Sequence, residues 1–177
     1  MLQTLLFIYV CLMVWAALYS NRLLFRPPPA ASTEHSIPLT MLESSRGDRI
    51  AACYLPNPTA RYTLLLAHGN GEDLGSVVPL GEVLRQQGFA VMMFDYPGYG
   101  LSSGRPTERG AYSAMDAAYD HLVSALKIPT DRIIAHGRSV GGGPAIDLAS
   151  RRPVAGAIAE SAFLTAFRVM THVRVLP

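Results

Sequence analysis

Cysteine and charge are both sparse in this sequence. Its 177 residues include two cysteines, and charged side chains make up 16% of the chain with a formal net charge of +2. So small a net charge gives no reason to expect a nucleic-acid partner. Cys11 lies in a long apolar run and Cys53 in an expected strand, so they predict no disulfide framework and leave the redox compartment open. The histidines are scattered and no zinc-type Cys/His spacing occurs, so we expect neither a metal nor a cofactor.

Charge is absent altogether from residues 2–19, LQTLLFIYVCLMVWAALY. A run this long and apolar predicts a transmembrane helix, with the lipid bilayer as its partner. A cleaved signal peptide is the alternative, but no Lys or Arg precedes the run and Ala16-Ala17-Leu18 is a poor cleavage site. Arg22 and Arg26 follow the run, so the positive-inside rule favours a single-pass N-terminal anchor with a cytoplasmic domain.

The chain divides into three predicted parts. Residues 2–19 form the anchor, residues 20–34 a proline-rich spacer, and residues 35–177 one domain of ordinary size. The spacer contains Arg26-Pro27-Pro28-Pro29, which favours a stiff, polyproline-like conformation that holds the domain away from the membrane.

Strand-length and helix-length apolar patterns alternate through the domain. Residues 37–42 and 49–55 predict an antiparallel hairpin. The later strand-length runs are residues 62–67, 89–94, 132–136 and 154–159, and the helical patterns are residues 76–87, residues 107–126 and a helix from Val140 onward. This alternation predicts an α/β fold in which helices cover both faces of a mostly parallel sheet. The loops after the parallel strands then meet at the carboxyl edge, where such proteins bind ligands.

The sequence Gly137-Arg138-Ser139-Val140-Gly141 lies between an expected strand and an expected helix. A serine in such a strand-to-helix turn is exposed only if its neighbours let strand and helix approach, which Gly137 and Gly141 allow. The helix start also directs the Val140 N–H toward the serine, where it could hold an oxyanion. We therefore predict that Ser139 is a catalytic nucleophile, with a chance Gly-x-Ser-x-Gly match as the alternative.

The loop His68-Gly69-Asn70-Gly71 follows the strand expected at residues 62–67. Its glycines let the backbone turn N–H groups toward the same edge, so we predict that Asn70 supplies the second oxyanion donor. A plain glycine turn is the alternative. His68 is predicted to brace this loop, because the base in this architecture follows the nucleophile along the chain.

Two further loop features leave alternatives open. Gly98, Gly100 and Gly104 are spaced somewhat like a dinucleotide-binding loop, but Arg105-Pro106 separates them from the next helix, which favours a rigid loop instead. Arg138, beside Ser139, either meets a negatively charged substrate group or makes structural contacts.

Taken together, these residues resemble the α/β-hydrolase superfamily. The features that match are residues 68–71, Asp95-Tyr96-Pro97-Gly98-Tyr99-Gly100, residues 137–141 and Glu160-Ser161-Ala162-Phe163. With the apolar N-terminal run, they are most similar to a membrane-anchored branch related to serine aminopeptidase-like hydrolases and protein depalmitoylases. The resemblance implies a serine hydrolase that cleaves an ester, thioester or amide of a small-molecule or acylated substrate through an acyl-Ser139 intermediate.

The chain departs from the family pattern at its C-terminal end. The family carries its acid after a seventh strand and its histidine after an eighth, whereas this chain ends at Pro177, after about the sixth. We therefore expect a truncated hydrolase, inactive as it stands unless Glu160 and His172 complete the triad. The alternative is a non-catalytic, membrane-anchored remnant that binds ligands through the same pocket.

Overall fold

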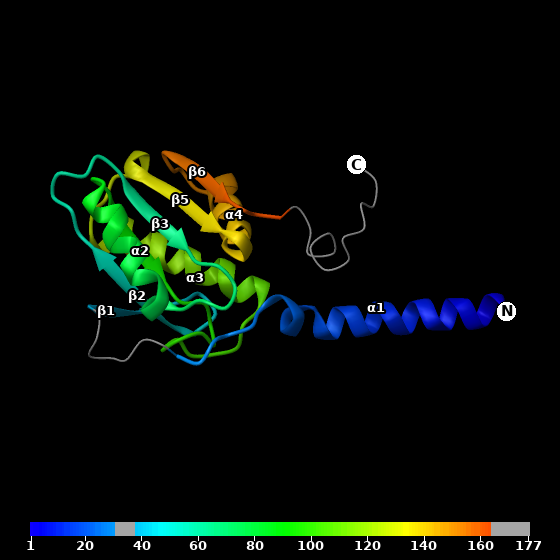
Figure 1. Cartoon of the computed structure of the whole chain (residues 1–177). Coiled ribbons are helices and arrows are strands. Elements are labelled where there is room, and N and C mark those ends of the chain that lie inside the picture. Colours follow the sequence, from blue (N-terminus) through cyan, green and yellow to red (C-terminus); the bar gives the residue numbers. More distant parts are fainter. Residues whose placement is uncertain (31–37, 164–177) are drawn as a thin grey trace.

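A sheet covered by helices on both faces forms the body of the molecule, and one helix projects from it (Figure 1). The computed structural model describes residues 1–30 and 38–163. In chain order the elements are α1 (Leu2–Leu24), β1 (Leu39–Glu43), β2 (Arg49–Leu55), β3 (Thr63–Ala67), α2 (Leu74–Gln86), β4 (Ala90–Phe94), α3 (Glu108–Asp120), β5 (Ile133–Arg138), α4 (Gly142–Arg151) and β6 (Gly156–Glu160). Short π- or 3₁₀-helical turns occupy His121–Ala125, Thr130–Arg132 and Ser139–Gly141.

The six strands lie in the order β1-β2-β4-β3-β5-β6. β1 and β2 form the predicted antiparallel hairpin, β2 runs antiparallel to β4, and β4, β3, β5 and β6 are mutually parallel. The predicted mostly parallel α/β sheet is therefore confirmed. Because β3, β4, β5 and β6 point the same way, the loops that follow them meet at one edge.

Side chains alternate between two apolar cores along the buried strands. In β3, Leu64 and Leu66 pack with the residues of α2 on one face of the sheet. Leu65 and Ala67 pack with α3 and α4 on the other face. A strand that is buried on both faces has a continuous apolar sequence. These strands could therefore be predicted from the sequence.

Side chains cap the starts of α2 and α3. α2 begins at Leu74, two residues before the predicted start, because Asp73 accepts a hydrogen bond from the Ser76 N–H at 3.1 Å while Ser76 Oγ accepts one from the Asp73 N–H at 2.9 Å. Thr107 caps α3 as predicted, accepting from the Gly110 N–H at 3.0 Å. The helix predicted through residue 126 is α-helical only to Asp120 and then continues as a π-helical turn.

The N-terminal helix α1 extends past the predicted anchor to Leu24 (Figure 1). It ends there because Arg26 precedes Pro27, and a residue before proline avoids the helical conformation. In the described part of the chain, no helix combines the length and apolar content required to cross a bilayer. The transmembrane helix predicted over residues 2–19 is corrected accordingly: the helix forms there, and its last turn carries Asn21 and Arg22 before Phe25 packs into the domain.

The two cysteines should differ sharply in reactivity. Burial raises the pKa of the Cys53 thiol from 9.0 to about 11, while Cys11 is exposed on α1. That shift lowers the thiolate fraction of Cys53 about 100-fold. We expect Ellman's reagent to modify Cys11 in the folded protein and Cys53 only after denaturation, as measured by release of thionitrobenzoate. Rapid reaction of folded Cys11→Ser protein would contradict the buried position of Cys53.

Candidate active site

Ser139 lies where β5 passes into the helical turn before α4. Its φ is +53°, in the left-handed region that a side chain other than glycine rarely adopts. Such strain costs on the order of 1–3 kcal/mol and persists only where the surrounding structure enforces it. Ser139 also lines a cavity.

Three glycines let the backbone close around Ser139. A Cβ on Gly137 would collide with the backbone of Gly141, and a Cβ on Gly141 would collide with the carbonyl of Ala67 at the end of β3. A Cβ on Gly142 would meet the Ala162 side chain at 2.5 Å. Gly137 and Gly141 therefore occupy the positions predicted to need glycine, and Gly142 is an additional one that the sequence analysis missed.

The backbone N–H of Val140 belongs to the first turn of the helix after Ser139. Backbone donors in a first turn have no acceptor within the helix and carry the positive end of its dipole. This N–H is therefore a donor beside the serine, as the sequence predicted, and its role toward substrate stays a prediction.

The loop after β3 lies close to the same turn. A Cβ on Gly141 would be 2.8 Å from the His68 carbonyl oxygen, and one on Gly69 would be 3.8 Å from Nε of Arg138. The His68 ring is buried between Tyr96 and Tyr99, with centroid distances of 4.4 and 5.6 Å. Its Nδ1 lies 2.9 Å from the Gly69 carbonyl oxygen, and its Nε2 lies 3.4 Å from Asp95. These contacts are those of a residue that fixes a loop.

Asn70 is held through its side chain. Its Oδ1 accepts hydrogen bonds from the Tyr99 hydroxyl at 2.9 Å and from the Arg26 N–H at 2.8 Å. Burial raises the pKa of Tyr99 to about 12, so its hydroxyl remains a donor at neutral pH. With Oδ1 occupied, the donors of Asn70 that have no acceptor among the described residues are its backbone N–H and its side-chain Nδ2 amide.

Arg138 and Glu72 join the turn to the loop. One oxygen of Glu72 pairs with the Arg138 guanidinium, and the other accepts the Gly69 N–H at 2.7 Å. This pairing favours the structural alternative for Arg138 over the contact with a charged substrate. It also removes the Gly69 N–H from the set of free oxyanion donors.

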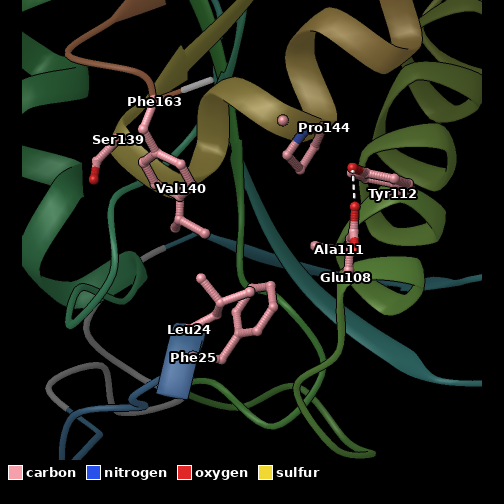
Figure 2. A pocket seen from close by; sticks show the side chains of 10 residues that line it. Leu24, Phe25, Glu108, Ala111, Tyr112, Ser139, Val140, Pro144 and Phe163 are labelled. Carbon is pink, nitrogen blue, oxygen red and sulfur yellow. Dashed lines mark hydrogen bonds between the residues drawn. The ribbon is translucent and has the colours of Figure 1, made fainter. Parts of the chain in front are cut away.

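The cavity beside Ser139 measures about 290 Å³. Figure 2 shows Ser139 and Phe163 on one side, Leu24 and Phe25 from the end of α1 on another, and Glu108 and Tyr112 opposite Ser139. Val140, Ala111 and Pro144 complete most of an apolar lining. Sequence reasoning missed Leu24 and Phe25, because no local motif marks a residue that reaches a site more than a hundred positions away.

Of the alternative acid and base, only Glu160 lies among the described residues. Glu160, at the end of β6, lies 3.1 Å from Nε2 of His136. Sequence reasoning missed this contact. The alternation of side chains along β5, which places His136 on a different face from Gly137, was the available signal. His172 lies outside the described residues. In residues 1–30 and 38–163, no three His, Cys, Asp or Glu side chains are grouped as metal ligands would be.

The glycine loop after β4 does not open into a helix. α3 begins at Glu108, after Arg105 and Pro106, so no helix N-terminus follows the glycines directly. Gly98 packs against Pro106, and Gly104 against Asp48. This geometry supports the rigid loop and argues against the dinucleotide-binding alternative.

Sequence comparison assigns a family to this arrangement. Residues 58–174 match the family model described as serine aminopeptidase, S33. The chain belongs to the serine aminopeptidase S33 family of α/β-hydrolases. It is 39% identical over 134 residues to alpha/beta hydrolase domain-containing protein 17B of Xenopus tropicalis, covering 73% of this chain and 46% of that protein. It is 33% identical over 148 residues to alpha/beta hydrolase domain-containing protein aho-3 of Caenorhabditis elegans, covering 81% and 44%.

The chain thus spans a little less than half of the length of these curated relatives. Solved α/β-hydrolase structures share its fold at low identity. The esterase Pf2001 of Pyrococcus furiosus superimposes with a TM-score of 0.69 at 19% identity, covering 86% of this chain and 63% of the esterase. An α/β-hydrolase of Vibrio vulnificus gives 0.66 at 23% identity, covering 78% and 50%. The family and fold are shown, and the placement in a membrane-anchored branch stays a prediction.

The close backbone contact at Gly141 gives a stability prediction with a matched control. Gly141→Ala places a methyl group against the Ala67 carbonyl and should lower the free energy of unfolding by about 1–3 kcal/mol. Gly143→Ala, two residues on, meets only Tyr112 at 3.6 Å and gains helix propensity, so it should be neutral or stabilising by up to about 1 kcal/mol. Urea denaturation measures both, and equal effects would mean that the turn can relax.

Proposed function

We propose that this protein is an acyl hydrolase whose nucleophile is Ser139. The observation that carries the proposal is the strained φ of +53° at Ser139, in a strand-to-helix turn that opens into a cavity. Membership of a hydrolase family and the elbow geometry support the same role. The substrate class is an ester, thioester or amide with an apolar acyl group.

In the proposed reaction, Ser139 Oγ attacks the carbonyl carbon and transfers its proton to a base. The carbonyl oxygen becomes an oxyanion, for which the Val140 and Asn70 backbone N–H groups are the proposed donors. The base returns this proton to the leaving group as its bond to the carbonyl carbon breaks, which leaves acyl-Ser139. Water then attacks the acyl carbon, releasing the free acid and restoring the Ser139 hydroxyl. Tyr96 and Tyr99 keep the loop donor in place through hydrogen bonds at 2.6 Å to His68 O and 2.9 Å to Asn70 Oδ1.

The proton acceptor separates this proposal from a binding role without catalysis. Among the described residues, the Ser139 hydroxyl forms no hydrogen bond to a base, and both ring nitrogens of His68 face Gly69 or Asp95. Without a base, residual catalysis falls orders of magnitude below that of a complete triad. The missing base among the described residues therefore favours the non-catalytic alternative. The reactivity of Ser139 decides between the hydrolase and the binding role.

Covalent labelling by a fluorophosphonate probe tests the nucleophile. We expect the full chain to be labelled, with mass spectrometry locating the adduct on Ser139. Ser139→Ala should lose the labelling, a fall of at least about 100-fold. Ser150→Ala, which removes an exposed serine hydroxyl of α4, should label like the unchanged protein. A folded protein whose Ser139 stays unlabelled would overturn the hydrolase and favour the binding role.

We further propose that α1 holds the domain at a lipid surface. Leu5, Leu12 and other large apolar side chains along α1 are about half exposed or more. A continuous apolar surface of this extent marks an interaction site. Trp15 stacks on Tyr19, and Arg22 lies over the Tyr19 ring at 5.6 Å, an aromatic and basic pairing suited to a headgroup layer. A cytoplasmic position of the domain stays a prediction from Arg22 and Arg26.

Flotation with phosphatidylcholine vesicles tests the role of α1. The double variant Leu5→Lys with Leu12→Lys should lower the partition coefficient at least about tenfold, because burying a leucine contributes roughly 1.5–3 kcal/mol. The control Val83→Lys with Ile146→Lys adds the same charge at exposed apolar positions of the domain and should float normally. Equal flotation of both double variants would contradict this role.

A further inference from the structure

The cavity beside Ser139 has a small volume. Its volume of about 290 Å³ lies at the lower end of the roughly 300–1,000 Å³ usual for small-molecule sites. Its wall opposite the nucleophile is polar, because the Tyr112 hydroxyl donates a 2.6 Å hydrogen bond to the Glu108 carboxylate there (Figure 2). An alkyl chain reaching that wall would desolvate a charged group, which is unfavourable. The apolar space is therefore bounded on that side by a polar wall.

The wall formed by the end of α1 is fixed in place. Phe25 is 5% exposed and packs edge-to-face on Tyr96, with ring centroids 6.1 Å apart. The next residue, Arg26, donates its backbone N–H to Asn70 at 2.8 Å. On the other side, Asn21 accepts the N–H of Glu108, the first residue of α3, at 3.4 Å. The segment that carries Leu24 and Phe25 is thus tied to both the loop after β3 and the start of α3.

From this geometry we infer that Phe25, with Leu24, forms a fixed wall of the acyl site and restricts the substrate to short or medium acyl groups. This inference rests on the proposed acyl-Ser139 intermediate, since it assigns the cavity to the acyl group of that intermediate. The specificity-determining residues then belong to the N-terminal helix segment rather than to the sheet. A larger side chain at residue 24 shortens the site, and a smaller one at residue 25 lengthens it.

Binding of fatty acids to Ser139→Ala protein tests the wall without requiring catalysis. Isothermal titration calorimetry with butanoate, octanoate and dodecanoate should show the best affinity for octanoate. Adding Phe25→Leu should raise the preference for dodecanoate over octanoate about fourfold, since it opens room for about one methylene and each newly buried methylene contributes about fourfold. Leu24→Trp should shift the preference toward butanoate. Because all variants keep the apolar surface of α1, non-specific binding there cancels in these ratios.

The control is Phe89→Leu, the same change at a partly buried phenylalanine on the opposite face of the sheet, which should leave the profile unchanged. Circular dichroism establishes that each variant is folded, and Leu24→Trp keeps the test open if Phe25→Leu does not fold. An unchanged profile in folded Phe25→Leu and Leu24→Trp proteins, or no binding of any chain, would overturn the inference.

Labelling of the Ser139 protein by ethyl, octyl and dodecyl fluorophosphonates separates this inference from the proposed hydrolase. If the chain-length profile of labelling is the same with and without Phe25→Leu, the inference about the cavity wall is wrong and the proposed hydrolase is unaffected. Loss of all labelling overturns the hydrolase, and the fatty-acid titrations then decide the wall alone.

Discussion

Direct backbone contact between β5, the turn that follows it and the end of β3 is the constraint on which the site depends. Side chains are excluded at Gly137 and Gly141 because each would collide with main-chain atoms of a neighbouring segment. The turn therefore closes tightly enough to force Ser139 to a φ of +53°. β5 is paired on both sides, with β3 and β6, so the sheet cannot yield and the strain is retained at the serine. The strained backbone of Ser139 is therefore a consequence of the pairing of β5 in the sheet.

The loop after β3 illustrates how polar groups are placed before any substrate arrives. Tyr96 holds the His68 carbonyl, Tyr99 holds the Asn70 side chain, and Glu72 holds the Gly69 N–H while pairing with Arg138. Each bond occupies a group that would otherwise compete for the substrate. Because the tyrosines are buried, burial raises their pKa values and they remain proton donors. Donors fixed in this way need no reorganisation when charge develops, which is the main source of oxyanion stabilisation.

The sequence predicted what local patterns encode and missed what distant contacts decide. Continuous apolar runs identified β3, β4 and β5, and the glycine spacing located the strand-to-helix turn at Ser139, because both signals depend on neighbouring residues. The start of α2 was misplaced because Asp73 and Ser76 cap each other, which an apolar count does not register. Phe25 and Tyr96 are in contact although they lie far apart in the chain, and no periodic pattern in the sequence predicts such a contact. His136 was overlooked for the same reason, since its partner Glu160 is on another strand.

The end of α1 contacts both the cavity beside Ser139 and the loop after β3. Phe25 follows α1 directly, without a linker, and it lines the cavity beside Ser139, while Arg26 bonds to Asn70 in the next position. Two adjacent residues therefore join the exposed apolar helix to both the cavity beside Ser139 and the loop that carries the second proposed oxyanion donor. An anchor attached through a flexible spacer would leave the site independent of its surroundings, whereas this attachment makes the helix part of the site.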